Sequence, residues 1–502
     1  MAGNHEGEGV MEQPLTLAER IGRTEKAGTG SPDLRPKLES SDLLEEVVPE
    51  RRRDGSLKMT LLWVTCQATV SNMYTGYLAR SAGMSLGDLL RASLIGVVVM
   101  VGYGLLATNV GTITGQPHSV LARGVLGKSG SALASVLLAV TGLGWYGFQA
   151  VFLAQLFNGL LGFTHLQLFC VLFAIVMITN NLLGFRSVSG YARLAAPVLL
   201  VWGAYTIIKA LASTAGPNLF AAPHVPPTQG ILLTVGLLVG VAVYGNEPDL
   251  FRYARRDRGR NIMPLVVGYG LGMLVFPVAG YLMAELSSAS TLGATMHFFT
   301  QFSLFGLTAL AVVVFTINVV AVNDANLYEA VNAVQNFLRG RRRIETVIVL
   351  GVLGAAVAAF MQRSSSLQDN FFIVANMCAV FLPCATIVLA IDVFLLERLS
   401  GCRRPAGQDG VPRAVTSWAA ASPGNVAGIV AIVAGLVVGA ITGGLIPGTS
   451  GFGTTNMGIP SVEAWMTTIV IYLAAMLLAR VLTSYRAKQV LLGLPAAEPV
   501  PA

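Results

Sequence analysis

A tryptophan and a glutamine one helical turn apart stand out in the apolar segment 131–158. Trp145 and Gln149 occupy positions i and i+4, so a helix places both side chains on the same face. An indole can cover the flat face of a heterocycle, and stacking of a base on an aromatic ring contributes about 1–3 kcal/mol. The Gln149 carboxamide offers donors and an acceptor to adjacent N–H and C=O groups on a ring edge. The pair predicts a site for a small planar molecule; the alternative is a core tryptophan beside an unrelated interhelical glutamine.

A second group of polar side chains lies in the apolar segment 301–338. It contains Asn318, Asn323, Asp324 and Asn326, in a setting where an unsatisfied polar group is costly. We therefore expect these side chains to face protein rather than lipid. Asn323 and Asn326 share a helix face, whereas Asn318 is rotated by about 140° from Asn323 at 100° per residue. Asn318 and Asn323 are candidate ligand-binding residues.

Carboxylates in or near the apolar segments are the candidates for carrying a proton. They are Glu247, Asp249, Asp324, Glu329 and Asp392. A charge near the middle of a bilayer costs about 2.5–3.5 kcal/mol on insertion scales, so a buried one calls for a functional explanation. Glu247 and Asp324 are the preferred proton-coupling candidates. The position of Asp392, near the end of its segment, favours a solvated or ion-paired structural role.

The elements that must position these residues are membrane-spanning helices. Hydrophobic residues make up 54% of the 502 and charged residues only 12%, against roughly a quarter charged in soluble domains. A spanning helix needs about 20 apolar residues. Such segments are found near 58–81, 89–113, 131–158, 165–184, 190–214, 230–253, 262–287, 301–338, 344–361, 371–396, 424–446 and 463–484. The sequence therefore predicts an all-α polytopic membrane protein with twelve transmembrane helices.

The distribution of Lys and Arg predicts the orientation of these helices. Arginines cluster before the first segment and after the sixth, eighth and tenth, whereas the loops 213–230, 287–303 and 446–462 contain no Lys or Arg. Loops rich in Lys and Arg stay on the cytoplasmic side. We expect a multi-pass protein of the cell membrane, inner or plasma, with both termini in the cytoplasm. The formal charge of +7 then belongs to these loops and indicates no nucleic-acid partner.

Residues 1–57 differ in composition from the rest of the chain. They are rich in Glu, Arg, Lys, Gly, Pro and Ser and contain few apolar residues, too few to offset the entropy of ordering a core. We predict a disordered cytoplasmic N-terminal tail. No apolar segment followed by a small-residue cleavage site opens the chain, so we expect the first span to insert directly.

Two of the predicted spans contain polar or helix-breaking residues near their centres. The first has Gln67, Thr69, Ser71 and Asn72, and the sixth has Gly240, Gly245, Asn246, Glu247, Pro248 and Asp249. Non-helical backbone at membrane depth is tolerated only inside protein or along a water-filled cavity. Interrupted helices at corresponding positions of two halves indicate an inverted-repeat transporter with its site at the midplane. Thr69 is then a candidate binding residue; plain helix packing through small polar side chains is the alternative for the first span.

Five short motifs are spread over these spans. They are MYTG at Met73–Gly76, GQPHSVLARGVLGKSGS at Gly115–Ser131, GWYGFQ at Gly144–Gln149, PDLFRY at Pro248–Tyr253 and NVVAVNDANLY at Asn318–Tyr328. Together they resemble the nucleobase:cation symporter-1 family, and within it the bacterial cytosine permeases, from about Met59 to Arg480.

The resemblance implies a specific fold and a function. The fold is a five-plus-five inverted-repeat transporter with broken helices 1 and 6: a ten-helix core at 58–420, two peripheral helices at 421–485 and a cytoplasmic tail at 486–502. The function is secondary active transport, by alternating access, of a nucleobase or related planar heterocycle held between spans 1, 3, 6 and 8. Family members commonly place a stacking Trp and a Gln where this chain has Trp145 and Gln149.

The resemblance also implies a second aromatic ring at the break in span 6. The local sequence is GVAVYGNEP, in which Gly240 lies where the aromatic is expected and Tyr244 follows one turn later. Both positions are candidates for contact with substrate. Cytosine permeases further tend to carry a Gln three residues before the Trp, and this position is Gly142 here. A purine or a hydantoin- or allantoin-like compound therefore stands beside cytosine as the expected substrate.

Coupling to sodium is not expected. Sodium-using members of the family supply two adjacent hydroxyl side chains before the Asn-Asp pair, and this chain has Ala321 and Val322 there. Protons are the natural substitute if transport is coupled. We expect no cofactor and no metal site. The chain also lacks Walker A, HExxH and Gly-x-Ser-x-Gly motifs, so ATP-driven pumping and hydrolase chemistry have no support and the protein is not expected to be an enzyme.

Two alternatives remain open on the sequence. One is an uncoupled facilitator or channel, which Ala321 and Val322 favour. The other is a carrier of the same fold for a different small solute, such as an amino acid, because fold does not fix function. The expected partners are the small planar base and the lipid bilayer, and the expected oligomeric state is a monomer or a weak dimer.

Overall fold

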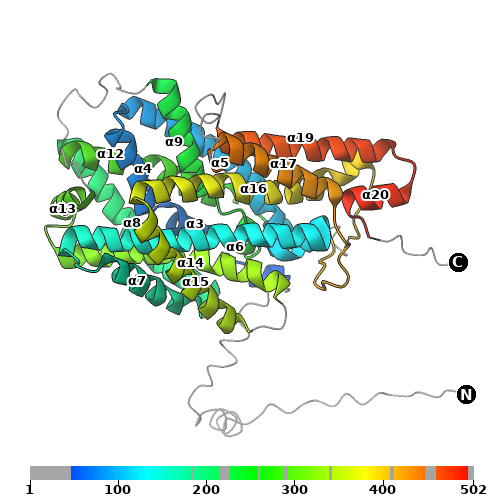
Figure 1. Ribbon diagram of the computed structural model, residues 1–502, viewed down its shortest axis with the longest axis horizontal. Helices are drawn as coiled ribbons and strands as arrows, with labels where there is room; N and C mark the ends of the chain where they lie inside the picture. The colour runs from blue at the N-terminus through cyan, green and yellow to red at the C-terminus, as the bar shows by residue number, and fades with distance from the viewer. Residues whose placement is uncertain are drawn as a thin grey trace, which may run out of the picture.

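The chain folds into a bundle of helices (Figure 1). The computed structural model describes residues 47–182, 185–213, 226–257, 261–287, 292–338, 342–406, 412–446 and 459–495. The helices are η1 (Glu50–Arg52), α3 (Ser56–Gln67), α4 (Val70–Ser81), α5 (Leu86–Thr114), α6 (His118–Leu161), α7 (Leu166–Asn181), α8 (Phe185–Ser213), α9 (Pro227–Ala242), α10 (Glu247–Phe251), α11 (Ile262–Gly270), the π-helix η3 (Leu271–Val275), α12 (Phe276–Ser287), α13 (Leu292–Ser303), α14 (Thr308–Phe337), α15 (Arg343–Ser364), α16 (Leu367–Ser400), α17 (Val426–Thr442), α19 (Pro460–Val481) and α20 (Tyr485–Leu492). The predicted all-α class is confirmed.

Eight helices of the described chain are long and apolar enough to cross a membrane, and three shorter apolar helices accompany them. The shorter ones are Leu166–Thr179, Pro227–Ala242 and Val426–Thr442. The first predicted span consists of two short helices, α3 and α4, in place of one long one. The protein is a multi-pass membrane protein, and the count of twelve crossings stays a prediction.

The predicted span 301–338 begins too early. Its first residues belong to α13, and α14 starts only at Thr308. Between the two helices the backbone reverses through Phe305 and Gly306, both with positive φ (57° and 71°). Hydropathy could not reveal this turn because Phe305 and Leu307 are themselves apolar and exposed.

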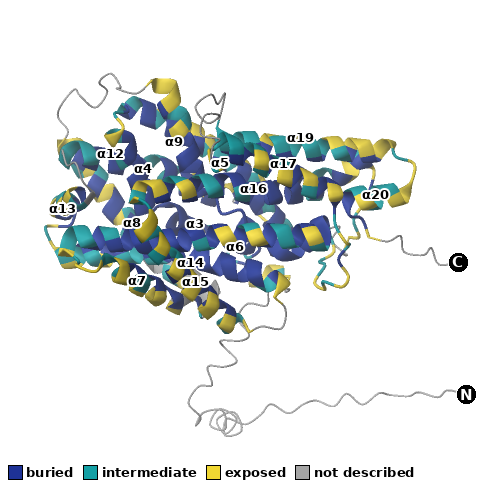
Figure 2. Ribbon diagram, in the orientation of Figure 1, coloured by how far each residue is buried: buried dark blue, intermediate teal, exposed yellow. Residues whose placement is uncertain are grey.

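Burial separates the inner helices from the outer ones (Figure 2). The most apolar windows of α6 and α16 are both 78% buried, against 33% for α19. Outer helices present apolar side chains outward, such as Val98 on α5 (73% exposed), Val349 on α15 (57%) and Val470 on α19 (59%). In lipid such exposure is favourable, and α6 and α16, buried in the centre, are the helices that can carry polar groups.

The inner helices form two packed groups. In the first, α3 and α4 pack against α11 and α12, and α5 packs against α9 and α10. In the second, α6 packs against α14 and α15, and α7 packs against α15. The helix α16 contacts both groups through α6 and α9. The two interrupted spans thus belong to one group, and Trp145 and Gln149 on α6 belong to the other.

The arginine-bearing segments meet at one end of the bundle, which we call the arginine-rich end. Arg255, after α10, donates to the carbonyl of Arg53, before α3 (3.1 Å). Arg404, after α16, donates to the carbonyl of Gly124, near the start of α6 (2.9 Å). The predicted gathering of these segments on one side is confirmed, and their assignment to the cytoplasm stays a prediction.

The last part of the predicted tail 1–57 is ordered, which corrects the expectation of disorder there. The Val48 N–H donates to the carbonyl of Gly115 (2.9 Å), and the Asp54 N–H donates to that of Tyr253 (2.6 Å). These backbone bonds join the segment before α3 to the ends of α5 and α10. Residue composition could not predict this, because the partners are backbone groups that any sequence provides. The tail before residue 47 lies outside the described residues.

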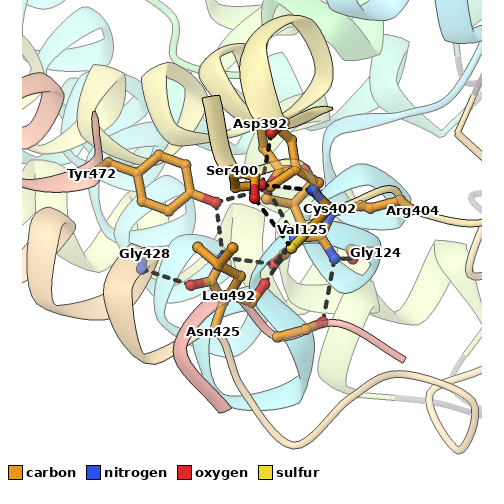
Figure 3. Close-up of polar contacts among 12 residues, drawn as sticks. Gly124, Val125, Asp392, Ser400, Cys402, Arg404, Asn425, Gly428, Tyr472 and Leu492 are labelled. Atoms are coloured by element: carbon orange, nitrogen blue, oxygen red, sulfur yellow. Dashed lines mark hydrogen bonds and ion pairs between the residues drawn. The ribbon is translucent and has the colours of Figure 1, made fainter. Parts of the chain in front are cut away.

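A buried ion pair holds the peripheral helices to the core (Figure 3). Arg404 forms two hydrogen bonds to Asp392, from Nε to Oδ1 (2.5 Å) and from a terminal nitrogen to Oδ2 (2.8 Å). The Tyr472 hydroxyl of α19 donates to the same Oδ2 (2.7 Å). Burial alone lowers the pKa of the Arg404 guanidinium, but Asp392 and Tyr472 raise that pKa above its usual range, so the guanidinium stays charged. The structural role expected for Asp392 is confirmed.

Further bonds extend this anchor to α6, α17 and α20. Arg404 donates to the carbonyls of Val125 (3.1 Å) and Leu492 (2.9 Å). Asn425, at the start of α17, donates to the Val125 carbonyl and to the Tyr472 hydroxyl, both at 3.0 Å. Helix α20 and its contacts lie largely within the predicted tail at 486–502, and the placement of that tail in the cytoplasm stays a prediction. These side chains donate to the carbonyls of Gly124 and Val125, which lie just before the kink in α6 at Gly127.

Asp392→Ala is expected to destabilise the fold by about 3–5 kcal/mol, because it leaves the Arg404 charge buried without its partner. All five cysteines are free and buried, so a thiol-reactive dye reports thermal unfolding of the detergent-solubilised protein. Arg403→Ala is the control, since Arg403 pairs with Glu397 on the surface. A variant at Asp392 that unfolds at the wild-type temperature would contradict the anchoring role.

Candidate functional site

The break in the first span lies between α3 and α4. Ala68 and Thr69 have non-helical backbone (ψ 75° and 152°), and the Thr69 side chain caps α4 by accepting from the Asn72 N–H (3.1 Å). Asn318 of α14 bridges the break: its Nδ2 donates to the Ala68 carbonyl (2.9 Å) and its Oδ1 accepts from the Val70 N–H (2.8 Å). The predicted break is confirmed, and Asn318 satisfies two of the backbone groups that it frees.

The neighbouring carbonyls of α3 are satisfied in the same way. The Tyr244 hydroxyl donates to the Cys66 carbonyl (3.0 Å), and Asn72 Nδ2 donates to the Gln67 carbonyl (2.7 Å). In return, Gln67 Nε2 donates to the carbonyl of Ala242 at the end of α9 (2.8 Å). The two interrupted spans are therefore joined to each other by bonds from side chains of each to backbone of the other.

The break in the sixth span lies at residues 243–246, between α9 and α10. Gly245 has a φ of 80°, in the left-handed region, and a Cβ there would collide with Leu382 of α16. The Thr386 hydroxyl, one turn further along α16, donates to the Gly245 carbonyl. The position therefore requires glycine both for its backbone angle and for its contact with α16.

The structure corrects the expected roles of Gly240 and Pro248. Gly240 lies within α9, and a Cβ there would meet the backbone of Ala375 on α16. Its role is close helix packing, and it leaves no room for the aromatic ring that the resemblance implies. Pro248 stands in the first turn of α10, where the backbone N–H that proline lacks would have no partner within the helix. It begins the second half of the broken span and does not interrupt the first.

Glu247 is buried at the start of α10 with both carboxylate oxygens bound. Oε2 accepts from the Tyr103 hydroxyl of α5 (2.9 Å), and Oε1 accepts from the Tyr244 N–H (3.2 Å). A carboxylate at a helix N-terminus also interacts favourably with the helix dipole. Glu247 thus holds the break in shape, as a fixed acceptor.

Trp145 and Gln149 lie one turn apart on α6, and Gln149 contacts the first break. The Gln149 carboxamide is within 3.1–3.2 Å of the Ser71 hydroxyl, at the start of α4. Gln149 is 2% exposed and Trp145 is 6% exposed. Ser71 belongs to the polar group seen in the sequence, but its link to Gln149 depends on how α4 and α6 pack.

Aromatic rings surround the Trp145 indole. Phe371 of α16 and Phe148 meet it edge-on, with centroids at 6.2 and 5.4 Å. Tyr74 of α4 packs edge-on against Phe371 (5.3 Å) and tilted against Phe152 (5.5 Å). Phe371 lies near the start of α16, whereas the arginine-rich end follows the end of that helix, so these rings lie away from the arginine-rich end. Phe371 was missed in the sequence because nothing local distinguishes it from the other apolar residues of α16.

Tyr244 is not the second aromatic of this site. Its ring packs against Trp63 of α3, with centroids 5.5 Å apart, and its hydroxyl bonds to the Cys66 carbonyl. This placement gives no support to the expected contact of Tyr244 with a ligand beside Trp145. Phe371 is the ring from another helix that the structure places beside Trp145.

Asn323 and Asp324 point away from the two breaks. Asn323 Nδ2 donates to the Tyr146 carbonyl (3.2 Å) and lies 2.9 Å from the Met177 sulfur on α7. Asp324 Oδ1 accepts from Asn181, also on α7 (3.4 Å). These two residues join α14 to α6 and α7, so the structure does not bring either of them to Gln149.

A polar network closes the arginine-rich end beneath the site. Asp249 of α10 accepts from the His118 N–H of α6 (2.6 Å) and from Asn332 of α14 (3.3 Å). Arg343 of α15 in turn donates to Asn332 (3.1 Å). Arg252 bonds to Tyr328 across the same interface (3.4 Å). Aromatic contacts thus flank the site on one side, and this hydrogen-bonded network lies on the other.

This arrangement defines a class of protein. Two interrupted helices are hydrogen-bonded to each other inside the bundle, with the Gln149 carboxamide beside one break, an arrangement typical of a transporter that binds its substrate between two repeats. The chain belongs to the family described as permeases for cytosine/purines, uracil, thiamine and allantoin, whose profile matches residues 46–457. It is a membrane transporter and not an enzyme.

Individual relatives agree with this membership. A cytosine permease of Escherichia coli is 24% identical over 324 residues, covering 63% of this chain and 74% of the permease. A hydantoin permease of Microbacterium maritypicum is 30% identical over 143 residues, covering 26% of this chain and 28% of that protein. The structure is similar to that of Mhp1, a nucleobase-cation-symport-1 family transporter in a closed conformation with bromovinylhydantoin bound. The TM-score is 0.64 at 18% identity, over 88% of this chain and 95% of that chain. This likeness confirms the inverted-repeat transporter fold.

Asn318→Ala is expected to destabilise the unliganded protein. It leaves the Ala68 carbonyl and the Val70 N–H without partners, at about 1–3 kcal/mol for each group. The dye-monitored unfolding temperature should fall in the absence of any ligand. Asn109→Ala is the matched control, since Asn109 donates to a carbonyl of its own helix. An unchanged unfolding temperature for Asn318→Ala would mean that the bridge is not needed to hold the break.

Proposed function

We propose that this protein is an alternating-access carrier for a nucleobase or a related planar heterocycle, such as cytosine, a purine or a hydantoin- or allantoin-like compound. It sits in the cell membrane with the arginine-rich end in the cytoplasm. The observation that carries the proposal is the pairing of Gln149 with Ser71 at the break in the first span, one helical turn along α6 from Trp145. The family membership and the relatives for cytosine and hydantoin support the same substrate class.

The proposed pose uses the chemistry of these three side chains. The indole covers one face of the ring, and Phe371 lies beside it at the ring edge. Gln149 and Ser71 hydrogen-bond to each other in the unliganded site, so a base edge can exchange that bond for its own N–H and C=O groups. Each polar atom then keeps a partner in both states, which limits the free energy lost on binding.

Transport is proposed to be independent of sodium. The carbonyls of Cys66, Gln67 and Ala68, at the break, each accept a hydrogen bond from a side chain. Ala321 and Val322, where sodium-using relatives are expected to have hydroxyls, supply no ligand. Carbonyl groups that already accept N–H and O–H donors gain less from a cation than unpaired ones would. Protons, in place of sodium, are the proposed coupling ion.

Gln149→Ala is expected to weaken base binding by about 1–3 kcal/mol, the cost of unpaired hydrogen-bonding groups, without loss of folding. The measurement is calorimetric titration of the purified protein with cytosine, uracil, adenine, hypoxanthine, hydantoin and allantoin. Gln155→Ala is the matched control, because Gln155 lies further along α6 and bonds to Gln362. Unchanged affinity for Gln149→Ala would make this residue a packing residue, and failure of all six compounds to bind would refute the planar-base assignment.

Replacement of sodium by potassium or choline is expected to change neither base affinity nor uptake into proteoliposomes. The reason is that the carbonyls of Gln67 and Ala68, at the break, already accept hydrogen bonds and are poor ligands for sodium. An imposed pH gradient, acidic outside, is expected to drive accumulation above equilibrium. Accumulation driven by a sodium gradient would contradict the coupling proposal, and the absence of accumulation under either gradient would favour a facilitator.

A further inference from the structure

Glu329 lies on the face of α14 that meets the two breaks. It follows Asn318 by 11 residues, which is three helical turns with an offset of only about 20°. Val322 and Ala325 lie between them on the same face, and both are buried and apolar. Glu329 is therefore the next ionisable group on this face, about 16 Å from Asn318 toward the arginine-rich end.

The Glu329 side chain is buried without a hydrogen-bond partner for Oε1. The residue is 4% exposed, and no donor in the described chain reaches that oxygen. The titratable groups that interact with it lie on α3, on α10, on α16 and between α9 and α10. They are Cys66 of α3, Tyr244 between α9 and α10, Glu247 and Asp249 of α10, and Cys378 of α16. None of these five is a cation, so an ionised carboxylate here has neither a donor at Oε1 nor a counterion among them.

The other fully buried carboxylates of the described chain are satisfied. Asp88, Glu247, Asp249, Asp324 and Asp392 each accept at least one hydrogen bond. Glu247 and Asp324, which the sequence favours for proton coupling, belong to this satisfied group. A buried carboxylate that accepts hydrogen bonds gains little from binding a proton. A buried carboxyl group whose oxygen has no hydrogen-bond donor is stable only in its neutral form.

Glu329 also lies close to the proposed binding site. The Cys378 thiol interacts both with Glu329 and with the Trp145 side chain. Tyr244, which interacts with Glu329, donates to the carbonyl that ends the first half of the broken span. A change in the charge of Glu329 therefore acts on residues that shape the site.

We propose that Glu329 is the proton-binding residue of this carrier, holding a proton on its carboxyl group in the closed state and losing it when the arginine-rich end opens. This inference rests on the proposed function. Opening separates α3 and α10 from α14, because these helices belong to the two different packed groups. Water then reaches Glu329, its O–H bond breaks, and the proton passes to water while the carboxylate becomes hydrated. After the carrier has reoriented, Glu329 takes up a proton from the opposite side before the loaded carrier closes again.

Glu329→Gln tests this step, because the amide mimics the neutral carboxyl and cannot release a proton. The full-length variant in proteoliposomes is expected to retain base counterflow, the exchange of labelled for unlabelled base, at a rate within about threefold of wild type. Accumulation driven by a pH gradient is expected to be lost. Glu463→Gln is the matched control: Glu463 on the peripheral α19 also has a buried oxygen without a partner, and its variant should accumulate base as wild type does.

The outcomes separate the two proposals. Retained pH-driven accumulation in Glu329→Gln overturns the role of Glu329 while leaving the carrier function intact. If the wild-type protein shows no counterflow with any of the six compounds used in the titration, the carrier function itself is overturned. Loss of both activities in Glu329→Gln, with wild-type unfolding temperature and base affinity, would also overturn the proposal, because a proton-binding residue is not needed for exchange.

Chemical labelling of carboxyl groups in the wild-type protein tests the protonation of Glu329 without any substitution. A hydrophobic carbodiimide adds to protonated carboxyl groups within membranes, and mass spectrometry of the digested protein locates the adduct. We expect modification at Glu329 that increases as the pH is lowered. Modification confined to Glu247 or Asp324, with Glu329 unlabelled, would overturn the assignment.

Discussion

The structure depends on one constraint: backbone groups freed by a broken helix inside a membrane must find partners within the protein. Two spans are broken here, and the freed carbonyls of the first accept from Tyr244, Asn72 and Asn318. The end of α9 accepts from Gln67. Because each break supplies donors to the other, neither can rearrange without exposing unpaired groups, and the two must move as one unit.

This constraint decides which polar residues are left for a ligand. Asn318 and Tyr244 are polar residues at mid-depth, and the sequence alone makes both look like binding residues. In the folded protein their hydrogen-bonding atoms are committed to backbone. Among the described residues, the side chains of Gln149 and Ser71 hydrogen-bond only to each other, so their pairing can be exchanged for a ligand at little cost. Structural residues have their hydrogen-bonding atoms bound to backbone groups, whereas binding residues can exchange their partner for a ligand. The amino-acid composition of a span does not distinguish the two.

Features with a local or periodic cause were predictable from the sequence. The break near Thr69 follows from polar residues in an apolar span, and the shared face of Trp145 and Gln149 follows from the helical repeat. The exact position of the second break was not predictable, because Gly240 and Gly245 are the same residue type and both face α16, yet only Gly245 has the left-handed backbone of the break. Periodicity separated Asn318 from Asn323, but only packing decides which of the two faces the breaks.

The two ends of the site are closed by different kinds of interaction, and this gives opening a direction. At the arginine-rich end, Asp249 and Asn332 hold α10, α6 and α14 together by hydrogen bonds, which water can replace nearly one for one. At the other end, Tyr74 and Phe371 bury apolar surface, and exposing that surface costs about 25 cal/mol for each Å². For the carrier proposed here, opening toward the arginine-rich end therefore costs less free energy than opening toward the aromatic rings, because water replaces hydrogen bonds but not buried apolar contacts.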